Sequence, residues 1–331
     1  MKELQAILKA WKEIEENVKQ SALATVVEVG GSSYRRPGAR MLLSQDGHRV
    51  GMISGGCLEG DVWLRAQQVM SSGQPVLATY DTTSPDDIVW GSGSGCRGIV
   101  RVLIEPLISP VSATSHEHPM PDLLAFITES LCSSSCSALA TVYNTEGTVA
   151  AKIGARLMSR SNGFATNGII DSEMACQIQA DACEALSSGR RSTNKRYQTR
   201  DGRAEVFIEV IAPPVPLVIF GAGPDTIPLV HFAHDLGWQV TVVNTRPHIR
   251  LSHHFEEASE VIAIEPESMV SHVSLNERTA VAIMTHNFLH DWELLKTLLP
   301  SPVQYIGLLG PRQRTEELLG CVAKTSDSLV K

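Results

Sequence analysis

The sequence lacks any long apolar segment, although it runs to 331 residues. Its longest apolar runs, such as residues 216–220 and 240–243, are the length of a strand and far short of the roughly 20 residues that a membrane-spanning helix needs. The N-terminus opens with the charged residues Lys2, Glu3 and Lys12 instead of an apolar signal segment. We therefore expect a cytoplasmic protein that does not associate with a membrane.

An excess of positive charge is also missing, since the formal net charge is −8. That charge repels phosphate backbones and argues against general nucleic-acid binding, although a local basic cluster could still hold one small anion. The seven cysteines are an odd number, and none of them forms a paired C-x-x-C zinc motif. A reduced compartment is expected, and a disulfide framework is not.

Short sequence matches indicate an internal duplication in the N-terminal two thirds of the chain. Ala-Leu-Ala-Thr-Val occurs at 22–26 and returns 116 residues later, and Gly-Ala-Arg at 38–40 returns at the same spacing. The matches predict an α+β domain over residues 1–112 and a degenerate second copy of it over residues 113–212.

What the second copy lacks is informative about function. It has no counterpart of Ser32–Pro37, of Ser54–Cys57 or of Gly95–Gly98. We infer that the first copy kept the chemistry and the second kept the scaffold.

A different pattern begins after the proline-rich junction at residues 212–216. Apolar strand-like segments alternate with helical ones to the end of the chain, which predicts a Rossmann-like, doubly wound parallel sheet over residues 213–331. Its first strand runs into Gly221 and Gly223, a turn that lets a phosphate approach the start of the next helix.

Two positions of this C-terminal domain depart from a dinucleotide-binding fingerprint. Thr226 replaces the third glycine, and Asn244 stands at the end of the second strand, where an acid usually holds the ribose hydroxyls. Neighbouring Arg246 is a candidate to face a phosphate instead. The alternative is a Rossmann scaffold whose pocket serves another ligand.

Polar residues follow two later strands of the same predicted sheet. His286 ends the fourth strand, and Arg312 follows the fifth, where open α/β sheets bind their ligands. His286 and Asp291 are candidates for a polar pair lining this crevice. The alternative makes His286 a loop histidine and Asp291 a helix cap.

A second candidate site lies in the first copy. Cys57 follows Gly55 and Gly56 at the predicted start of a helix, where backbone N–H groups and the helix dipole favour a thiolate. Cys96 also follows a glycine, so both cysteines are candidate ligands for a metal or a sulfur-rich anion. The alternative is that either cysteine is a small buried apolar residue.

Basic residues are concentrated near these cysteines in an otherwise acidic chain. They are Arg35, Arg36, Arg40 and Arg97. Soft thiolates beside cations suit a sulfur-rich anionic ligand.

Taken in order, these motifs resemble those of the XdhC/CoxI family. The N-terminal part of the resemblance lies in residues 31–41, 55–59 and 95–98. The C-terminal part lies in Gly221–Gly223, Asn244–Pro247, Thr285–His286 with Asp291, and Tyr305–Arg312.

The resemblance implies an accessory factor for a xanthine dehydrogenase-type molybdenum hydroxylase, a chaperone more than a catalyst. Such a factor binds the molybdenum cofactor, supports its sulfuration together with a cysteine desulfurase, delivers it to the apoenzyme and acts as a homodimer. No residue is then assigned a catalytic role.

The resemblance also divides the candidate residues between the two ends of such a cofactor. Cys57 and Cys96 would contact its molybdenum or sulfur end, while Arg35, Arg36 and Arg40 would hold its phosphate. The C-terminal domain would bind a nucleotide or the anionic tail of the pterin through Gly221, Gly223, Asn244, Arg246, His286 and Arg312.

An NAD(P)-dependent oxidoreductase is the alternative function, with His286 as its acid or base. An intact third glycine and an acid at position 244 would have favoured it, and the sequence has neither.

Overall fold

The computed structural model describes residues 1–17, 20–81, 98–107, 123–160, 163–244, 255–264 and 272–329. The chain forms two compact units, one of Glu3–Pro213 and one of Pro214–Lys331 together with the first two residues. Each unit is described by itself.

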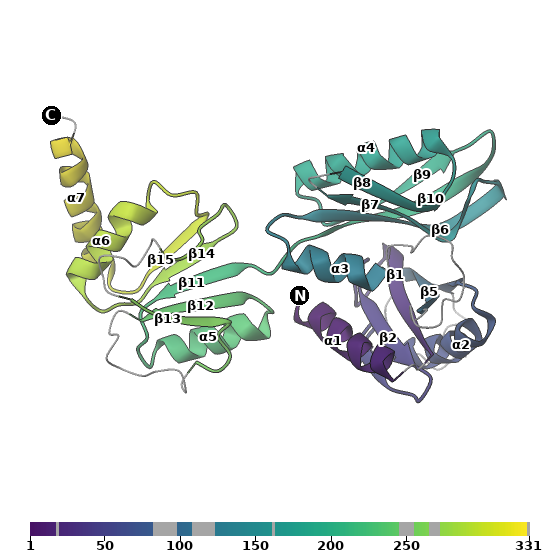
Figure 1. Cartoon of the computed structure of the whole chain (residues 1–331), viewed down its shortest axis with the longest axis horizontal. Helices are drawn as coiled ribbons and strands as arrows, with labels where there is room; N and C mark the ends of the chain where they lie inside the picture. The colour runs from purple at the N-terminus through teal and green to yellow at the C-terminus, as the bar shows by residue number, and fades with distance from the viewer. Residues whose placement is uncertain are drawn as a thin grey trace. The chain divides into compact units, whose positions relative to one another are not determined.

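Residues 3–213 contain two α+β copies in series (Figure 1). The first copy consists of α1 (Lys2–Glu16), β1 (Ser21–Gly31), β2 (Arg40–Ser44), β3 (Arg49–Gly51), α2 (Glu59–Ser72), β4 (Val76–Asp81) and β5 (Gly98–Leu107). The second consists of α3 (Leu123–Cys132), β6 (Ser137–Thr148), β7 (Ala151–Arg160), β8 (Gly163–Ile169), α4 (Ser172–Ser188), β9 (Ser192–Gln198) and β10 (Asp201–Ile211).

The two copies have the same antiparallel sheet. Its strand order is β3-β2-β1-β5-β4 in the first copy and β8-β7-β6-β10-β9 in the second. Helices α2 and α4 each end at a left-handed glycine, Gly73 and Gly189, which are 116 residues apart. Residues 3–213 therefore contain the same arrangement of sheet and helix twice.

Alternation along the strands gives each sheet two apolar faces. Ala22, Ala24 and Val26 of β1 pack in a cluster with the apolar side of α2, while Leu23 and Val27 belong to other clusters on the opposite face. This period of two is the one that a strand requires. Each sheet is thus covered by α2 or α4 on one face, and its other face packs against α1, α3 and the other copy.

The two sheets pack against each other through equivalent residues. Val27 and Leu103 of the first copy form one buried cluster with Tyr143 and Phe207 of the second. Val27 and Tyr143 are each the extra residue of a β-bulge, because the pairing register skips both positions. The contact therefore has the character of a two-fold dimer within one chain.

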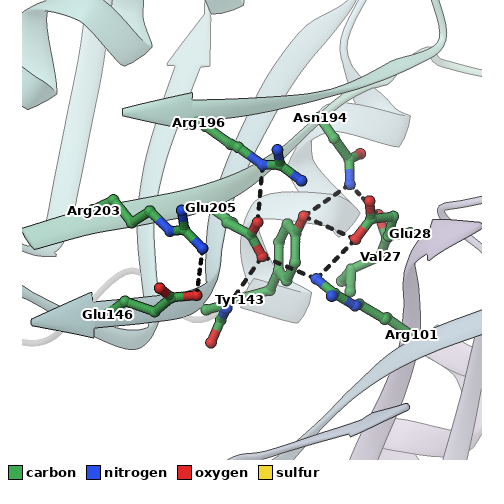
Figure 2. Close-up of polar contacts among 10 residues, drawn as sticks. Val27, Glu28, Arg101, Tyr143, Glu146, Asn194, Arg196, Arg203 and Glu205 are labelled. Carbon is green, nitrogen blue, oxygen red and sulfur yellow. Dashed lines mark hydrogen bonds and ion pairs between the residues drawn. The ribbon is translucent and has the colours of Figure 1, made fainter. Parts of the chain in front are cut away.

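Polar side chains surround this apolar contact. Arg101 of β5 lies between Glu28 of β1 and Glu205 of β10, at 3.1 and 2.9 Å (Figure 2). Asn194 donates to the carbonyl of Val27 at 3.0 Å. Backbone and side-chain bonds therefore join the two copies around their shared core.

The C-terminal unit is a parallel sheet with helices on both faces, as predicted. Its order, β13-β12-β11-β14-β15, is that of a Rossmann-like domain. One apolar cluster joins α5 to the sheet, and another joins α6 and α7 to it. The elements are β11 (Pro216–Phe220), α5 (Thr226–Asp235), β12 (Gln239–Asn244), β13 (Glu260–Ala263), β14 (Ala280–Ile283), α6 (Phe288–Leu298), β15 (Tyr305–Leu308) and α7 (Arg312–Leu329).

Among the described residues, no helix combines the length and the apolar character that crossing a membrane requires.

Candidate functional site

The first loop of interest joins β1 to β2 and contains residues 32–39. Gly38 folds it back onto β1, because its N–H donates to the carbonyl of Val26 at 2.8 Å with a φ of +94°, a value that favours glycine. The equivalent stretch of the second copy is a hairpin, in which only two residues separate β6 from β7. The equivalent segments therefore form a loop in the first copy, which carries the basic residues, and extended strands joined by a tight turn in the second.

The second loop, residues 52–58, leads into α2 and is held by Ser54 and Glu59. The Ser54 N–H donates to Glu59 Oε1 at 2.8 Å, and the Leu58 N–H donates to Ser54 Oγ at 3.1 Å. Burial by itself would raise the pKa of Glu59, but the hydrogen bonds from the Ser54 hydroxyl and from backbone N–H groups outweigh it and lower the pKa. Glu59 is therefore held as a carboxylate that fixes this loop.

Comparison with the second copy shows what the glycines of this loop do. Asp171 caps α4 by accepting from the N–H groups of Glu173 and Met174, and the residue 116 positions earlier is Gly55. Helix α2, however, begins only at Glu59, two residues later than the sequence predicted. The first helical turn of the second copy is thus replaced by a glycine-rich loop in the first.

The unwound turn presents its backbone and one thiol to solvent. Gly55, Gly56 and Cys57 are all exposed. Within the part of the chain that the structure describes, the N–H groups of Gly55 and Cys57 donate no hydrogen bond. Such N–H groups before a helix are suited to an anion.

The two loops contact each other. A Cβ on Gly55 would lie 3.5 Å from the ring of Tyr34, which is 68% exposed. Arg36 is exposed on the same loop as Tyr34. An aromatic face, a guanidinium, backbone donors and a thiol are therefore carried by two touching loops, a donor set that fits an anionic ligand with a soft end.

The other predicted residues of this site lie elsewhere or have other partners. Arg35 is half-buried in an ion pair with Glu3 of α1. Arg40 is buried, and Glu209 of the second copy binds its guanidinium, so Arg40 is not offered to a ligand. Cys96 lies outside the described residues. The described residues contain no cluster of three or more His, Cys, Asp or Glu side chains that suits a metal ion.

In the C-terminal unit, Gly221 ends β11 where only glycine fits. A Cβ there would lie 2.2 Å from the carbonyl oxygen of Met284, and the φ of Gly221 is +127°. Thr226 is fully buried, with its hydroxyl 3.4 Å from the Gly221 carbonyl oxygen. The residue that replaces the third glycine thus helps to hold the turn.

His286 lies beside this turn, in the loop that follows β14. Its φ of +56° is the one positive value of a non-glycine residue recorded for the described part of the chain. Its Nε2 lies 2.8 Å from Asp225 Oδ2, and Gly223 lies beside the pair. The structure therefore pairs His286 with Asp225, where the sequence suggested Asp291, at the point between β11 and β14 where ligands bind such sheets.

Asp291 is buried and has partners of its own. Thr285 Oγ1 donates to one of its carboxylate oxygens and Arg314 Nη2 to the other, each at 2.5 Å. The cap of α6 is Asn287, not Asp291. Asp291 lies on the apolar face of α6 with Leu294 and Leu298, and this spacing is the sequence signal that it needs a buried cation.

Arg314, which the sequence patterns did not single out, therefore has a structural role in this unit. It also donates to the Leu309 carbonyl at 3.2 Å. Arg312, by contrast, has a side chain that is 92% exposed and pairs with Glu316 one turn along α7. Asn244 is buried at the end of β12, and Arg246 lies outside the described residues.

Comparisons with known proteins match both units. The model of the XdhC and CoxI family matches residues 15–81, and that of the XdhC Rossmann domain matches residues 217–328. A Bacillus subtilis protein described as a probable xanthine dehydrogenase subunit is 33% identical over 305 residues, which cover 92% of this chain and 83% of that protein.

Two further proteins show shorter or structural similarity. The molybdenum cofactor insertion chaperone PaoD of Escherichia coli is 32% identical over 105 residues, 31% of this chain and 33% of its own length. A crystal structure described as a xanthine dehydrogenase from Bacillus halodurans aligns with this chain with a TM-score of 0.72 and 29% identity. The alignment covers 95% of this chain and 85% of that one.

Proposed function

This chain belongs to the XdhC and CoxI family, and from that premise we propose that it is an accessory factor for a molybdenum hydroxylase. It binds the molybdenum cofactor, keeps it while a cysteine desulfurase provides its terminal sulfur, and delivers it to a xanthine dehydrogenase-type apoenzyme. The names of the Bacillus subtilis and Escherichia coli relatives support this class of role. The observation that carries the proposal is the exposed Gly55-Gly56-Cys57 turn beside Tyr34 and Arg36.

Each group of this turn suits one part of such a cofactor. The cofactor supplies an anionic pterin, a dithiolene that holds the metal, and a phosphate. Arg36 is exposed, and its guanidinium has no partner recorded among the described residues, so we assign it to the phosphate. The N–H groups of Gly55 and Cys57 add donors. The ring of Tyr34 offers a face for the planar pterin, and the Cys57 thiol lies beside the metal or sulfur end.

Arg35 and Arg40 enter this proposal differently from Arg36. Arg35 orients the loop through Glu3, and Arg40 supports it from beneath. Cys96 stays in the proposal as a second thiol and metal ligand, on the strength of its glycine-rich sequence alone.

The C-terminal unit binds a nucleotide or the cofactor's anionic tail in this proposal. Gly221 and Gly223 shape the phosphate turn, and the Asp225–His286 pair lines the same crevice. Asn244, Arg246 and Arg312 remain proposed contacts, and the protein is proposed to act as a homodimer.

An anaerobic titration with free molybdenum cofactor tests the proposal. The parent, Cys57→Ser and Cys176→Ser are compared, because Cys176 is an exposed cysteine near the start of the equivalent helix α4. Saturable binding that only Cys57→Ser weakens is the expected result. Equal binding by all three proteins would remove the thiol from the site.

The same titration with NAD and NADP tests the alternative function. Dinucleotide binding without any binding of the molybdenum cofactor would contradict the chaperone role and favour an NAD(P)-dependent oxidoreductase.

A further inference from the structure

We propose that Glu209, a residue of the second copy, is a positioning residue for the ligand site of the first copy. It acts through Arg40, which connects the two loops of that site. The inference rests on the proposed function and adds a role for the copy that lacks the ligand motifs.

The contact between Glu209 and Arg40 is buried and bidentate. The Arg40 side chain is 5% exposed and that of Glu209 is 9% exposed. Arg40 Nη1 donates to Glu209 Oε2 at 3.0 Å, and Nη2 donates to the other carboxylate oxygen. A bidentate pair of this kind fixes direction as well as distance.

Arg40 in turn contacts both loops. It directly follows residues 32–39, and its guanidinium donates to the Gly38 carbonyl at 3.2 Å. Its own carbonyl accepts from the N–H of Met52, at the start of residues 52–58, at 3.0 Å. Gly51 permits this approach, because a Cβ there would lie 2.3 Å from the Arg40 carbonyl oxygen.

A second arginine–glutamate pair joins the copies at equivalent positions, although there a single nitrogen, Arg156 Nη2, donates to both oxygens. Among the described residues, no loop with the ligand motifs adjoins this pair. Arg156, which lies 116 residues after Arg40, donates to both carboxylate oxygens of Glu105 at 2.7 Å. In each pair a left-handed glycine, Gly38 or Gly154, lies against the carboxylate. Arg156, however, lies within β7 of the hairpin.

The repeated Gly-Ala-Arg motif therefore serves the contact between copies, and only one of the two contacts supports a site. This explains why the chain keeps a second copy without the Gly-Gly-Cys motif. Removing the carboxylate of Glu209 leaves Arg40, which contacts both loops, without its charged partner. Removing the carboxylate of Glu105 affects Arg156 in β7, which carries no ligand motif.

The matched variants Glu209→Gln and Glu105→Gln test this inference in the full-length protein. Both are expected to lower the melting temperature, since each removes the charged partner of an arginine whose side chain is only 5% (Arg40) or 13% (Arg156) exposed. At a temperature well below both transitions, Glu209→Gln is expected to weaken binding of free molybdenum cofactor about tenfold or more, because misplaced binding groups are costly. Glu105→Gln is expected to bind like the parent.

A second measurement does not depend on the cofactor. The alkylation rate of Cys57, followed by peptide mass spectrometry, reports on the loop of residues 52–58. Glu209→Gln is expected to change this rate, and Glu105→Gln is expected to leave it at the parent value, with Cys176 as the internal reference.

Equal effects of the two variants on both measurements would overturn the inference. If either Gln variant fails to fold, Glu209→Asp and Glu105→Asp replace the pair, because they keep the charge and withdraw the carboxylate by one methylene. If the parent itself does not bind the cofactor, the proposed function fails, while the Cys57 labelling still decides whether Glu209 positions the loop.

Discussion

His286 and Asp225 face each other across the turn between β11 and α5, with Nε2 and Oδ2 2.8 Å apart. His286 holds this position with a left-handed backbone, φ +56°, which costs a non-glycine residue on the order of 1–2 kcal/mol. Backbone strain beyond the carboxyl ends of parallel strands, where ligands bind such sheets, is typical of a functional position.

We predict that His286→Gly separates stability from binding. Glycine relieves the backbone strain, so the variant is expected to be as stable as the parent, or more stable by up to about 1 kcal/mol. Loss of the imidazole is expected to weaken binding of the ligand that the C-terminal unit takes, whether this is molybdenum cofactor, NAD or NADP. Urea unfolding and the titration measure the two effects. Unchanged binding would show that the strained histidine does not serve a ligand.

Arg314 and Arg312 allow a comparison two residues apart on one helix. Arg314→Ala leaves the buried carboxylate of Asp291 without its cation, which is expected to cost about 3–5 kcal/mol of unfolding free energy. Arg312→Ala removes a solvent-exposed pair with Glu316 and is expected to cost about 1 kcal/mol at most. Chemical denaturation measures both. Similar losses for the two variants would contradict the burial that the structure gives to Asp291.

Gly221 is expected to tolerate no side chain. Gly221→Ala places a Cβ against the Met284 carbonyl oxygen in a left-handed backbone, so a loss of at least about 1–3 kcal/mol is expected. Gly320→Ala is the control, because Gly320 lies in α7 with open space around it. That change is expected to stabilise the helix by about 0.5–1 kcal/mol. Thermal unfolding distinguishes the two, and a stable Gly221→Ala would show that β11 and β14 lie further apart.

The polar contacts of Glu205, of which the one with Arg101 joins the two copies, predict an acid-sensitive contribution to stability. Burial by itself would raise the pKa of Glu205, but hydrogen bonds from Asn144 and Arg196 and the charge of Arg101 outweigh it and lower the pKa (Figure 2). When folding lowers the pKa of a carboxyl, the carboxyl stabilises the protein at pH values above its ordinary pKa of 4.5. This contribution is lost as the pH falls through the lower pKa of the folded state.

Glu205→Gln is therefore expected to be less stable at neutral pH and to lose less further stability on acidification below about pH 4.5. Urea denaturation across this pH range measures the difference, with Glu184→Gln on the exposed side of α4 as the control for removing one carboxyl. If the unfolding free energy of the parent and of Glu205→Gln changed with pH in parallel, the partners of Glu205 would not lower its pKa in the folded protein.

The candidate site of the first copy shows which features could be assigned in advance. Adjacent glycines before an apolar helix marked residues 55–57 as a candidate anion site, but the sequence placed the start of the helix at Cys57 and left its burial open. The structure begins the helix at Glu59 and exposes Cys57. Arg40 could not be assigned from such a pattern. It has the same charge and nearly the same place in the sequence as Arg36, yet the strand register turns it toward Glu209, which is 169 residues away.

The sequence by itself determined the elements and their order: the duplicated α+β copies, the parallel C-terminal sheet and the glycine turns. Periodicity and backbone preference act over a few residues, and a repeat is visible in the sequence itself. All three can therefore be recognised without the tertiary structure. Only the tertiary structure decided which charged side chains pair with each other: Arg40 with Glu209, His286 with Asp225, and Arg314 with Asp291. The carboxylates of Glu209 and Asp291 are buried in these pairs. Such pairs depend on strand register and on packing between distant segments, and a desolvated charge stays in the fold only where that packing supplies its partner.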